Sequence, residues 1–263
     1  MSTAASRPLT GPLAVLGRQV LDRVQLLGQW WLLWFRTNQL VCRGNINGRQ
    51  LVRQLDALGV GSIPMACLTV TFSSAVLAVY TIDQFKQYGF TDYIGRLIGM
   101  RVTRELGPVL TAIVVASREG SRMAAELASM KVTEQIDALR SMATDPVEYL
   151  VVPRYLGALL GMPALTTLAS FAGICGGYFV AVAHAVPADT YWSSVARGVE
   201  PSYLLSGGIK ALLFGAIIAT VACRTGLSTG YGAAAVGRSV TTSVVLCVLL
   251  VHIADFGLAL VFG

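Results

Sequence analysis

Three apolar stretches of this chain are interrupted by charged side chains. Arg104 and Glu105 are adjacent in one stretch, Lys210 interrupts a second and Asp255 a third. An ionised side chain at membrane depth costs at least about 2.5 kcal/mol, so such residues usually face the interior of a helix bundle or a water-filled cavity. These four residues are therefore the candidate site.

Two interpretations of these charges are open from the sequence. Glu105, Lys210 and Asp255 could form an ion-pair cluster that only fixes helix packing. Alternatively, they form a polar patch in an otherwise apolar cavity, which suits an amphiphile with a charged head and acyl tails. In that case Arg104 meets an anionic head group, and the charge-free faces of the first and fifth apolar segments hold the tails.

Other chemical motifs are weak. Residues 226–230 match G-x-S-x-G, but a nucleophile elbow needs a strand before it, and here an apolar helix precedes, so glycine turns are the better interpretation. His184 and His252 each stand alone, without the spacing of a metal site. No G-x-x-x-x-G-K-[ST] sequence occurs, so the chain cannot bind a nucleotide by a P-loop. We expect no catalytic residue, no metal and no cofactor in this chain.

The composition is typical of a membrane protein. Hydrophobic residues make up 54% of the 263 positions and charged residues 13%, whereas a soluble domain has about 25% charged residues. The net charge of +6 does not indicate nucleic-acid binding, because seven of the twenty lysines and arginines precede Val60, as in a basic cytoplasmic flank. No C-x-x-C pair occurs, and four of the five cysteines lie in apolar runs, where small buried hydrophobic residues are expected.

The apolar pattern predicts an all-α membrane protein with an N-terminal interfacial helix and five transmembrane helices. Residues 1–17 lack the features of a secretory signal, so we expect the N-terminus to stay in the cytoplasm. The interfacial helix is expected over 18–40, anchored by Trp30, Trp31 and Trp34, because its charge-free run is too short to cross a bilayer. A short, tilted transmembrane helix is the alternative. The five transmembrane segments are predicted at 57–82, 94–126, 154–189, 203–223 and 239–262.

A short amphipathic helix is predicted over 131–142, between the second and third segments. Val132, Ile136 and Leu139 form its apolar stripe. The polar residues around that stripe are Lys131, Glu134, Gln135, Asp137 and Arg140. A helix that only completes a loop is the alternative interpretation.

The chain is expected to begin its third segment after a helix cap. Asp145, Pro146 and Glu148 suit the N-cap, first and third helical positions. With the N-terminus inside, the connections at 118–154 and 224–238 are cytoplasmic, and the positive-inside rule then accounts for the basic residues near them. These are Arg118, Arg122, Lys131, Arg140, Arg154, Arg224 and Arg238.

Four runs carry a resemblance to a known family. They read RELGP from Arg104, GSxxAAEL from Gly120, MKVTEQIDAL from Met130 and DPxxYLVxPR from Asp145. In these runs the chain resembles the MlaE/YrbE family of ABC-transporter permeases, and the likeness extends from about Leu51 to the C-terminus. The chain departs from the family pattern at Ser117 and Ser129, where glycine is usual, and at Glu119, where an apolar residue is common.

The resemblance implies a permease that moves phospholipid or a related lipid between membranes of the cell envelope. It implies a multi-pass protein of the bacterial inner membrane, a homodimer, a separate ATPase that binds the ATP, and an MCE-domain lipid-binding partner. A single permease domain would comprise an N-terminal tail and interfacial helix over 1–50 and a transmembrane domain over 51–263.

The resemblance also suggests roles for particular residues. Family residues that match Glu105 and Lys210 lie close to a lipid-binding cavity. The candidate substrate-binding residues are Arg104, Glu105, Lys210 and Asp255. The candidate ATPase-coupling residues are Lys131, Glu134, Gln135, Asp137 and Arg140. A structural or assembly subunit with no substrate path is the second function class, although the intramembrane charges favour a transporter.

Overall fold

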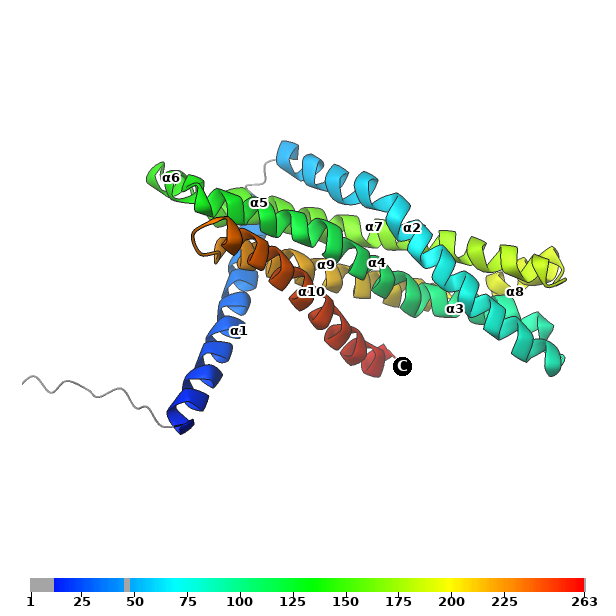
Figure 1. Ribbon diagram of the computed structural model, residues 1–263. Helices are drawn as coiled ribbons and strands as arrows, with labels where there is room; N and C mark the ends of the chain where they lie inside the picture. Colours follow the sequence, from blue (N-terminus) through cyan, green and yellow to red (C-terminus); the bar gives the residue numbers. More distant parts are fainter. Residues whose placement is uncertain (1–11, 45–47, 263) are drawn as a thin grey trace, which may run out of the picture.

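The computed structural model describes residues 12–44 and 48–262, and all regular structure in those ranges is helical (Figure 1). The all-α membrane fold expected from the apolar pattern is therefore confirmed. The long helices are α1 (Pro12–Arg43), α2 (Gly48–Gln87), α7 (Val152–Ala183), α9 (Pro201–Leu227) and α10 (Ala233–Phe262). The shorter helices are α3 (Ile94–Arg101), α4 (Gly107–Val115), α5 (Ser121–Val132), α6 (Gln135–Ser141) and α8 (Ala188–Gly198). The remaining turns are the 3-10 turn η1 (Thr91–Tyr93) and the π-helical turns η2 (Val102–Leu106), η3 (Ala116–Gly120) and η4 (Val147–Val151).

Among the described residues, four helices are long and apolar enough to cross a membrane. They are α2, α7 with the preceding η4, α9 and α10, which correspond to the first, third, fourth and fifth predicted segments. The second predicted segment, 94–126, is a helical path built from α3, η2, α4, η3 and α5 instead of one regular helix. In Figure 1 this path runs along the bundle between the end that carries α6 and the end that carries α3 and α8.

Two π-helical turns interrupt this path, and each contains an Arg-Glu pair. Arg104 and Glu105 lie in η2, and Arg118 and Glu119 lie in η3. A π turn adds one residue to the helical path and thereby rotates the residues that follow; such turns are frequent at functional sites. Pro108, in the first turn of α4, has no N–H to donate to the turn before it. The π turn η2 lies directly before the helix that contains Pro108.

Helices α2 and α7 approach closely because α7 presents glycines to α2. A Cβ at Gly157 would lie 2.7 Å from the Gln54 Cβ, and a Cβ at Gly176 would lie 2.7 Å from the Thr71 carbonyl oxygen. Inside a bilayer, helices associate largely through van der Waals contact, which small residues make possible. The α2–α7 pair is thus a tightly packed frame for the rest of the bundle.

Helix α1 leaves the bundle sideways, whereas the long helices α2 and α7 run along each other (Figure 1). It is not among the helices apolar enough to span a membrane. Trp31 is 66% exposed and Phe35 is 53% exposed, so α1 presents large aromatic side chains to its surroundings. The interfacial position of α1 stays a prediction.

The short helix between the second and third passes begins later than expected. Glu134 has a left-handed φ of +59°, a conformation that cannot continue an α-helix. Helix α5 therefore continues through Lys131 to Val132, and α6 starts at Gln135. The prediction of one helix over 131–142 is wrong at its N-terminal end, because the chain turns a corner there.

Helix α6 is held against the bundle by its apolar face. Ile136 is 1% exposed and packs in a cluster that includes Leu33 of α1 and Val147 of η4. The predicted capping by Asp145 is confirmed, since the Val147 N–H donates to Asp145 Oδ1 at 3.0 Å. The part expected of Glu148 stays a prediction. The polar side of α6 is therefore the side that a partner could contact.

Candidate functional site

Lys210 lies at the centre of a charge cluster formed by three elements. Its side chain is 0% exposed, and its Nζ lies 2.8 Å from Glu105 Oε2 in η2 and 2.9 Å from Asp255 Oδ1 in α10. A buried ammonium needs such partners, because an unpaired charge in an apolar interior is very costly. The structure therefore brings together three of the four candidate substrate-binding residues through direct ion pairs.

Arg104 lies at the edge of the same cluster. Its Nε is 3.9 Å from Glu105 Oε1, and its guanidinium lies over the ring of Tyr203, 5.8 Å from the centroid. The side chains of Arg104 and Glu105 are 22% and 27% exposed, and that of Asp255 is 21% exposed. The cluster is thus closed around Lys210 and partly open at its other members, where an atom of a ligand could reach it.

A close approach of two backbones sets this geometry. A Cβ at Gly207 of α9 would lie 2.5 Å from the carbonyl oxygen of Thr103 in η2, so only glycine fits there without movement. Lys210 follows three positions later and lies on the same face of α9 as Gly207. Because α9 contacts η2 at this point, the Lys210 ammonium meets the Glu105 carboxylate.

Two hollows with uncharged linings are formed partly by α9. One, of about 270 Å³, lies between η2, α7, α8 and α9, and its lining includes Thr103, Thr166, Ser170, Phe171, Trp192 and Gly207. The other, of about 670 Å³, lies between α1, α9 and α10, and its lining includes Trp30, Trp31, Trp34, Leu213, Ile217 and Leu250. The four charged candidates line neither hollow, although Thr103 and Gly207 place the first one next to the cluster. The fifth segment contributes Leu250 to the second hollow, whereas the first segment contributes to neither.

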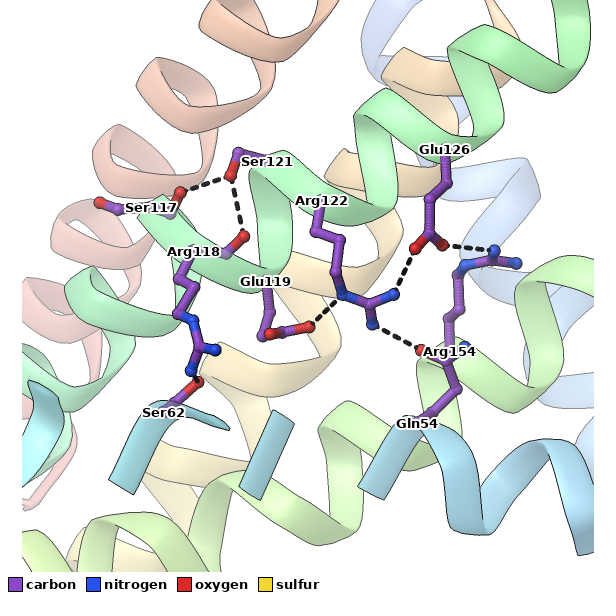
Figure 2. A network of polar contacts seen from close by, with 9 residues as sticks. All are labelled: Gln54, Ser62, Ser117, Arg118, Glu119, Ser121, Arg122, Glu126 and Arg154. Carbon is purple, nitrogen blue, oxygen red and sulfur yellow. Dashed lines mark hydrogen bonds and ion pairs between the residues drawn. The ribbon is translucent and has the colours of Figure 1, made fainter. Parts of the chain in front are cut away.

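A second charged network, which sequence reasoning missed, ties α2 to α5 (Figure 2). Arg122 of α5 donates to Glu119 Oε2 at 2.7 Å, to Glu126 Oε1 at 2.5 Å and to Gln54 Oε1 of α2 at 2.9 Å. Glu119 is only 2% exposed. A single guanidinium therefore compensates a buried carboxylate and links two helices.

Arg154 extends this network to α7. Its guanidinium donates to Glu126 Oε2 at 2.9 Å (Figure 2). In η3, Arg118 donates to Ser62 Oγ of α2 at 3.4 Å. Gly61 leaves the space for Arg118, since a Cβ at Gly61 would lie 2.6 Å from the guanidinium nitrogens. Helices α2, α5 and α7 are thus joined by polar contacts toward the α6 end of the bundle.

Part of the signal for this network was present in the sequence. Glu119, Arg122 and Glu126 are spaced i, i+3 and i+7, which places them on one helical face. The positive-inside rule had accounted for Arg122 and Arg154 only as basic residues near the cytoplasmic side. Burial of Glu119 adds a second role for Arg122, because a buried carboxylate needs a cationic partner.

The candidate ATPase-coupling residues gather at the corner between α5 and α6. Lys131 Nζ lies 3.1 Å from Asp137 Oδ2, and an Arg140 guanidinium nitrogen lies 2.9 Å from Asp137 Oδ1. Asp137 is therefore used to hold the corner together. Glu134 and Gln135 are exposed at the bend, so they are the acidic and amide groups most available to a partner.

Comparison with known proteins identifies the family. Residues 51–261 match the family described as Permease MlaE. A probable ABC transporter permease protein of Rickettsia felis is 36% identical over 242 residues, which cover 92% of this chain and 93% of that protein. A probable ABC transporter permease protein of Synechocystis is 39% identical over 230 residues, which cover 86% of this chain and 88% of that protein. The chloroplastic protein TRIGALACTOSYLDIACYLGLYCEROL 1 of Arabidopsis thaliana is 35% identical over 223 residues, which cover 84% of this chain and 64% of that protein.

The family match covers the five predicted membrane segments as far as residue 261 and both charged groups described above. The four long apolar helices agree with the membrane subunit that the word permease denotes. The chain belongs to the MlaE permease family and is a multi-pass membrane protein of the ABC-transporter permease type.

Proposed function

We propose that this permease moves phospholipid or a related lipid between membranes of the cell envelope. The observation that carries the proposal is the fully buried Lys210 bonded to Glu105 and Asp255 within an apolar bundle. A lipid has a polar head and acyl tails, so its path needs a few polar groups within apolar surface. The charge cluster and the neighbouring uncharged hollow supply both kinds of surface.

The chemistry of the cluster suits a lipid head group. A guanidinium such as that of Arg104 binds phosphate oxygens with charge-assisted hydrogen bonds. The partly exposed carboxylates of Glu105 and Asp255 would repel an anionic phosphate. They would thereby limit the positions that the phosphate can take beside Arg104. The Arabidopsis relative supports a lipid cargo, because its name contains that of a diacylglycerol lipid.

ATP hydrolysis would take place in a separate ATPase that docks at the α5–α6 corner. Exposed Glu134 and Gln135 would contact it, while buried Ile136 would pass movement of α6 to the permease's own core. From this corner, the helical path continues through α5, η3 and α4 to η2, which carries Glu105. One continuous path therefore connects the docking corner to the charge cluster, and the ATP stays with the partner.

The assembly we infer is a homodimer with two ATPase copies in a bacterial inner membrane. A bundle of this size corresponds to half a transporter by analogy with the family. The α6 end would face the cytoplasm, with α1 in the membrane interface, and an MCE-domain lipid-binding protein would meet the opposite end. Purification in mild detergent with mass spectrometry of the intact complex tests this; one permease copy per complex would contradict it.

A structural or assembly subunit of an envelope complex is the second candidate. It would use the Lys210 cluster only to fix helix packing, and removal of one charge would then strand its partner in the bundle. The two candidates therefore differ in what happens to folding and to transport when a single charge is removed.

The decisive experiment is lipid transport by the reconstituted complex that carries Lys210→Ala or Glu105→Ala. Under the proposal, each variant is expressed and dimerises near the wild-type level but loses lipid transport. Lys86→Ala serves as the control, since Lys86 is an exposed lysine at the far end of α2. Misfolding of each single variant, with recovery of folding and transport in the double variant, would establish the structural role instead.

A further inference from the structure

A basic groove lies beside α1 at the α6 end of the bundle. Its volume is about 710 Å³, and its walls come from α1, from the end of α6 with the connection to η4, and from the last turns of α9. Each wall supplies one arginine, Arg36, Arg140 or Arg224, and Asp145 is the only acidic residue among the described residues of the lining. Three arginines and one aspartate give the lining a formal net charge of +2.

These arginines are compensated to different degrees. Arg36 lies 2.8 Å from an Asp145 carboxylate oxygen, and its side chain is 58% exposed. Arg140 is 62% exposed and is bonded to Asp137 outside the groove. Arg224 donates to the amide oxygen of Gln29, a neutral partner. The groove therefore offers positive charge to an anion, most directly at Arg224.

The floor of the groove is apolar. Leu33 and Val147 are each 9% exposed at its base, and Leu227 also lines it. Leu32, at 67% exposed, contributes an apolar edge. Basic walls over an apolar floor fit an amphiphilic ligand with an anionic head, and they fit a hydrophilic protein loop less well.

The course of α9 sets the depth of this groove. Residues 213–221 of α9 line the uncharged hollow beside the α1 tryptophans, and Arg224 and Leu227 line the basic groove further along. At 1.5 Å per residue, Arg224 lies roughly 10 Å closer to the α6 end than Ile217, in the middle of the stretch that lines that hollow. Tryptophans concentrate at the membrane interface. With the α1 tryptophans at the interface, Arg224 would lie at the level of lipid head groups.

We propose that this groove binds the phosphate head group of an anionic phospholipid in the leaflet at the α6 end. Guanidinium groups match phosphate geometry and can bind it in a bidentate manner. The apolar floor would accept the glycerol and the first methylenes of the lipid. The site is separate from the Lys210 cluster and stands whether or not a lipid is the cargo. A lipid bound there holds α1 against α6 and α9.

The test uses the full-length permease without its ATPase, in vesicles that contain phosphatidylglycerol and phosphatidylcholine in equal amounts. After gentle extraction, native mass spectrometry counts the lipids that remain bound. We expect retained phosphatidylglycerol to exceed phosphatidylcholine. Arg224→Gln should lower phosphatidylglycerol retention about tenfold, the loss expected for one charge-assisted contact.

A second variant keeps the test independent of the fold around Arg224. Leu32→Glu places a negative charge at the groove edge on an exposed position, so it should lower phosphatidylglycerol retention without loss of internal contacts. Val52→Glu is the matched control, because Val52 is 64% exposed and begins α2 at the same end but does not line the groove. It should leave retention unchanged.

Three outcomes would overturn the proposal. The first is equal phosphatidylglycerol retention in wild type, Arg224→Gln and Leu32→Glu. The second is unchanged lipid retention in Arg224→Gln combined with weaker ATPase co-purification when the same variant is purified separately as the complex, which would make the groove a protein-docking surface. The third is binding of inorganic phosphate by the detergent-solubilised permease with no preference for phosphatidylglycerol, which would make it a free-phosphate site.

Discussion

The Lys210 cluster and the Arg122 network use the same kinds of side chain but differ in which charged group is buried. The Arg122 network comprises Gln54, Glu119, Arg122, Glu126 and Arg154. In the first, the cation is fully buried, and the carboxylates of Glu105 and Asp255 are 27% and 21% exposed. In the second, the carboxylate of Glu119 is buried at 2% exposure, and the guanidinium of Arg122 is 31% exposed. The first joins η2, α9 and α10, whereas the second joins α2 and α5, with α7 linked through Arg154.

This difference indicates which charges hold the bundle together and which are available to a ligand. A carboxylate that reaches the surface can exchange one partner for water or a head group at modest cost. A fully buried carboxylate cannot, so its partner becomes essential to the fold. We therefore expect the Arg122 network to act mainly on stability and the Lys210 cluster mainly on transport.

The largest expected effect is on stability and comes from Arg122→Ala. This change leaves Glu119 buried without its guanidinium partner, which should destabilise the permease by about 3–5 kcal/mol. Thermal unfolding of the detergent-purified protein measures it. Arg238→Ala, at an exposed position toward the same end, is the control. If the two variants melt at the same temperature, the Arg122 network stabilises the permease no more than an exposed surface charge does.

A second pair of variants tests the close approach that positions Lys210. Gly207→Ala forces a Cβ to within 2.5 Å of the Thr103 carbonyl oxygen, so α9 must move away from η2, at a cost of about 1–3 kcal/mol. Gly208→Ala meets no atom within 4 Å and should stabilise α9 by about 0.5–1 kcal/mol. Gly207→Ala should lower both lipid transport and the free energy of unfolding. Gly208→Ala should change both in the opposite direction. A similar response in both would show that the approach of α9 to η2 is not what positions the cluster.

The smallest effect on stability is expected at the α5–α6 corner. Glu134→Lys combined with Gln135→Lys should change the free energy of unfolding by less than about 0.5 kcal/mol, because both side chains are exposed. It should nevertheless reduce ATPase co-purification, because it removes one negative charge and adds two positive charges at the docking face. Asp137 is left intact, since it holds Lys131 and Arg140.

The corner variant has a matched control at the opposite end of the bundle. Asp83→Lys with Gln84→Lys makes the same chemical change at exposed positions near the end of α2. ATPase co-purification should stay at the wild-type level in this control. If the corner variant also retains the ATPase fully, the docking face lies elsewhere.

The sequence by itself determined the membrane class, the four long apolar helices and the family. Apolar runs of this length have no stable soluble arrangement, and the motifs from Arg104 to Arg154 are specific to one family. Charge balance also made the pairing of Lys210 with Glu105 and Asp255 foreseeable, because a lysine in such a run needs compensating carboxylates. These properties follow from composition and from local spacing.

Only the tertiary structure decided how the charges are shared between helices. The π turns of the second pass and the left-handed backbone of Glu134 do not appear in the apolar periodicity, so the start of α6 was misplaced. The contacts of Arg122 with Gln54 and of Arg154 with Glu126 join residues far apart in the sequence. The basic groove likewise needs three separate elements to meet. Such contacts depend on how closely helices pack, which is set by the assembled bundle and not by the spacing within any one helix.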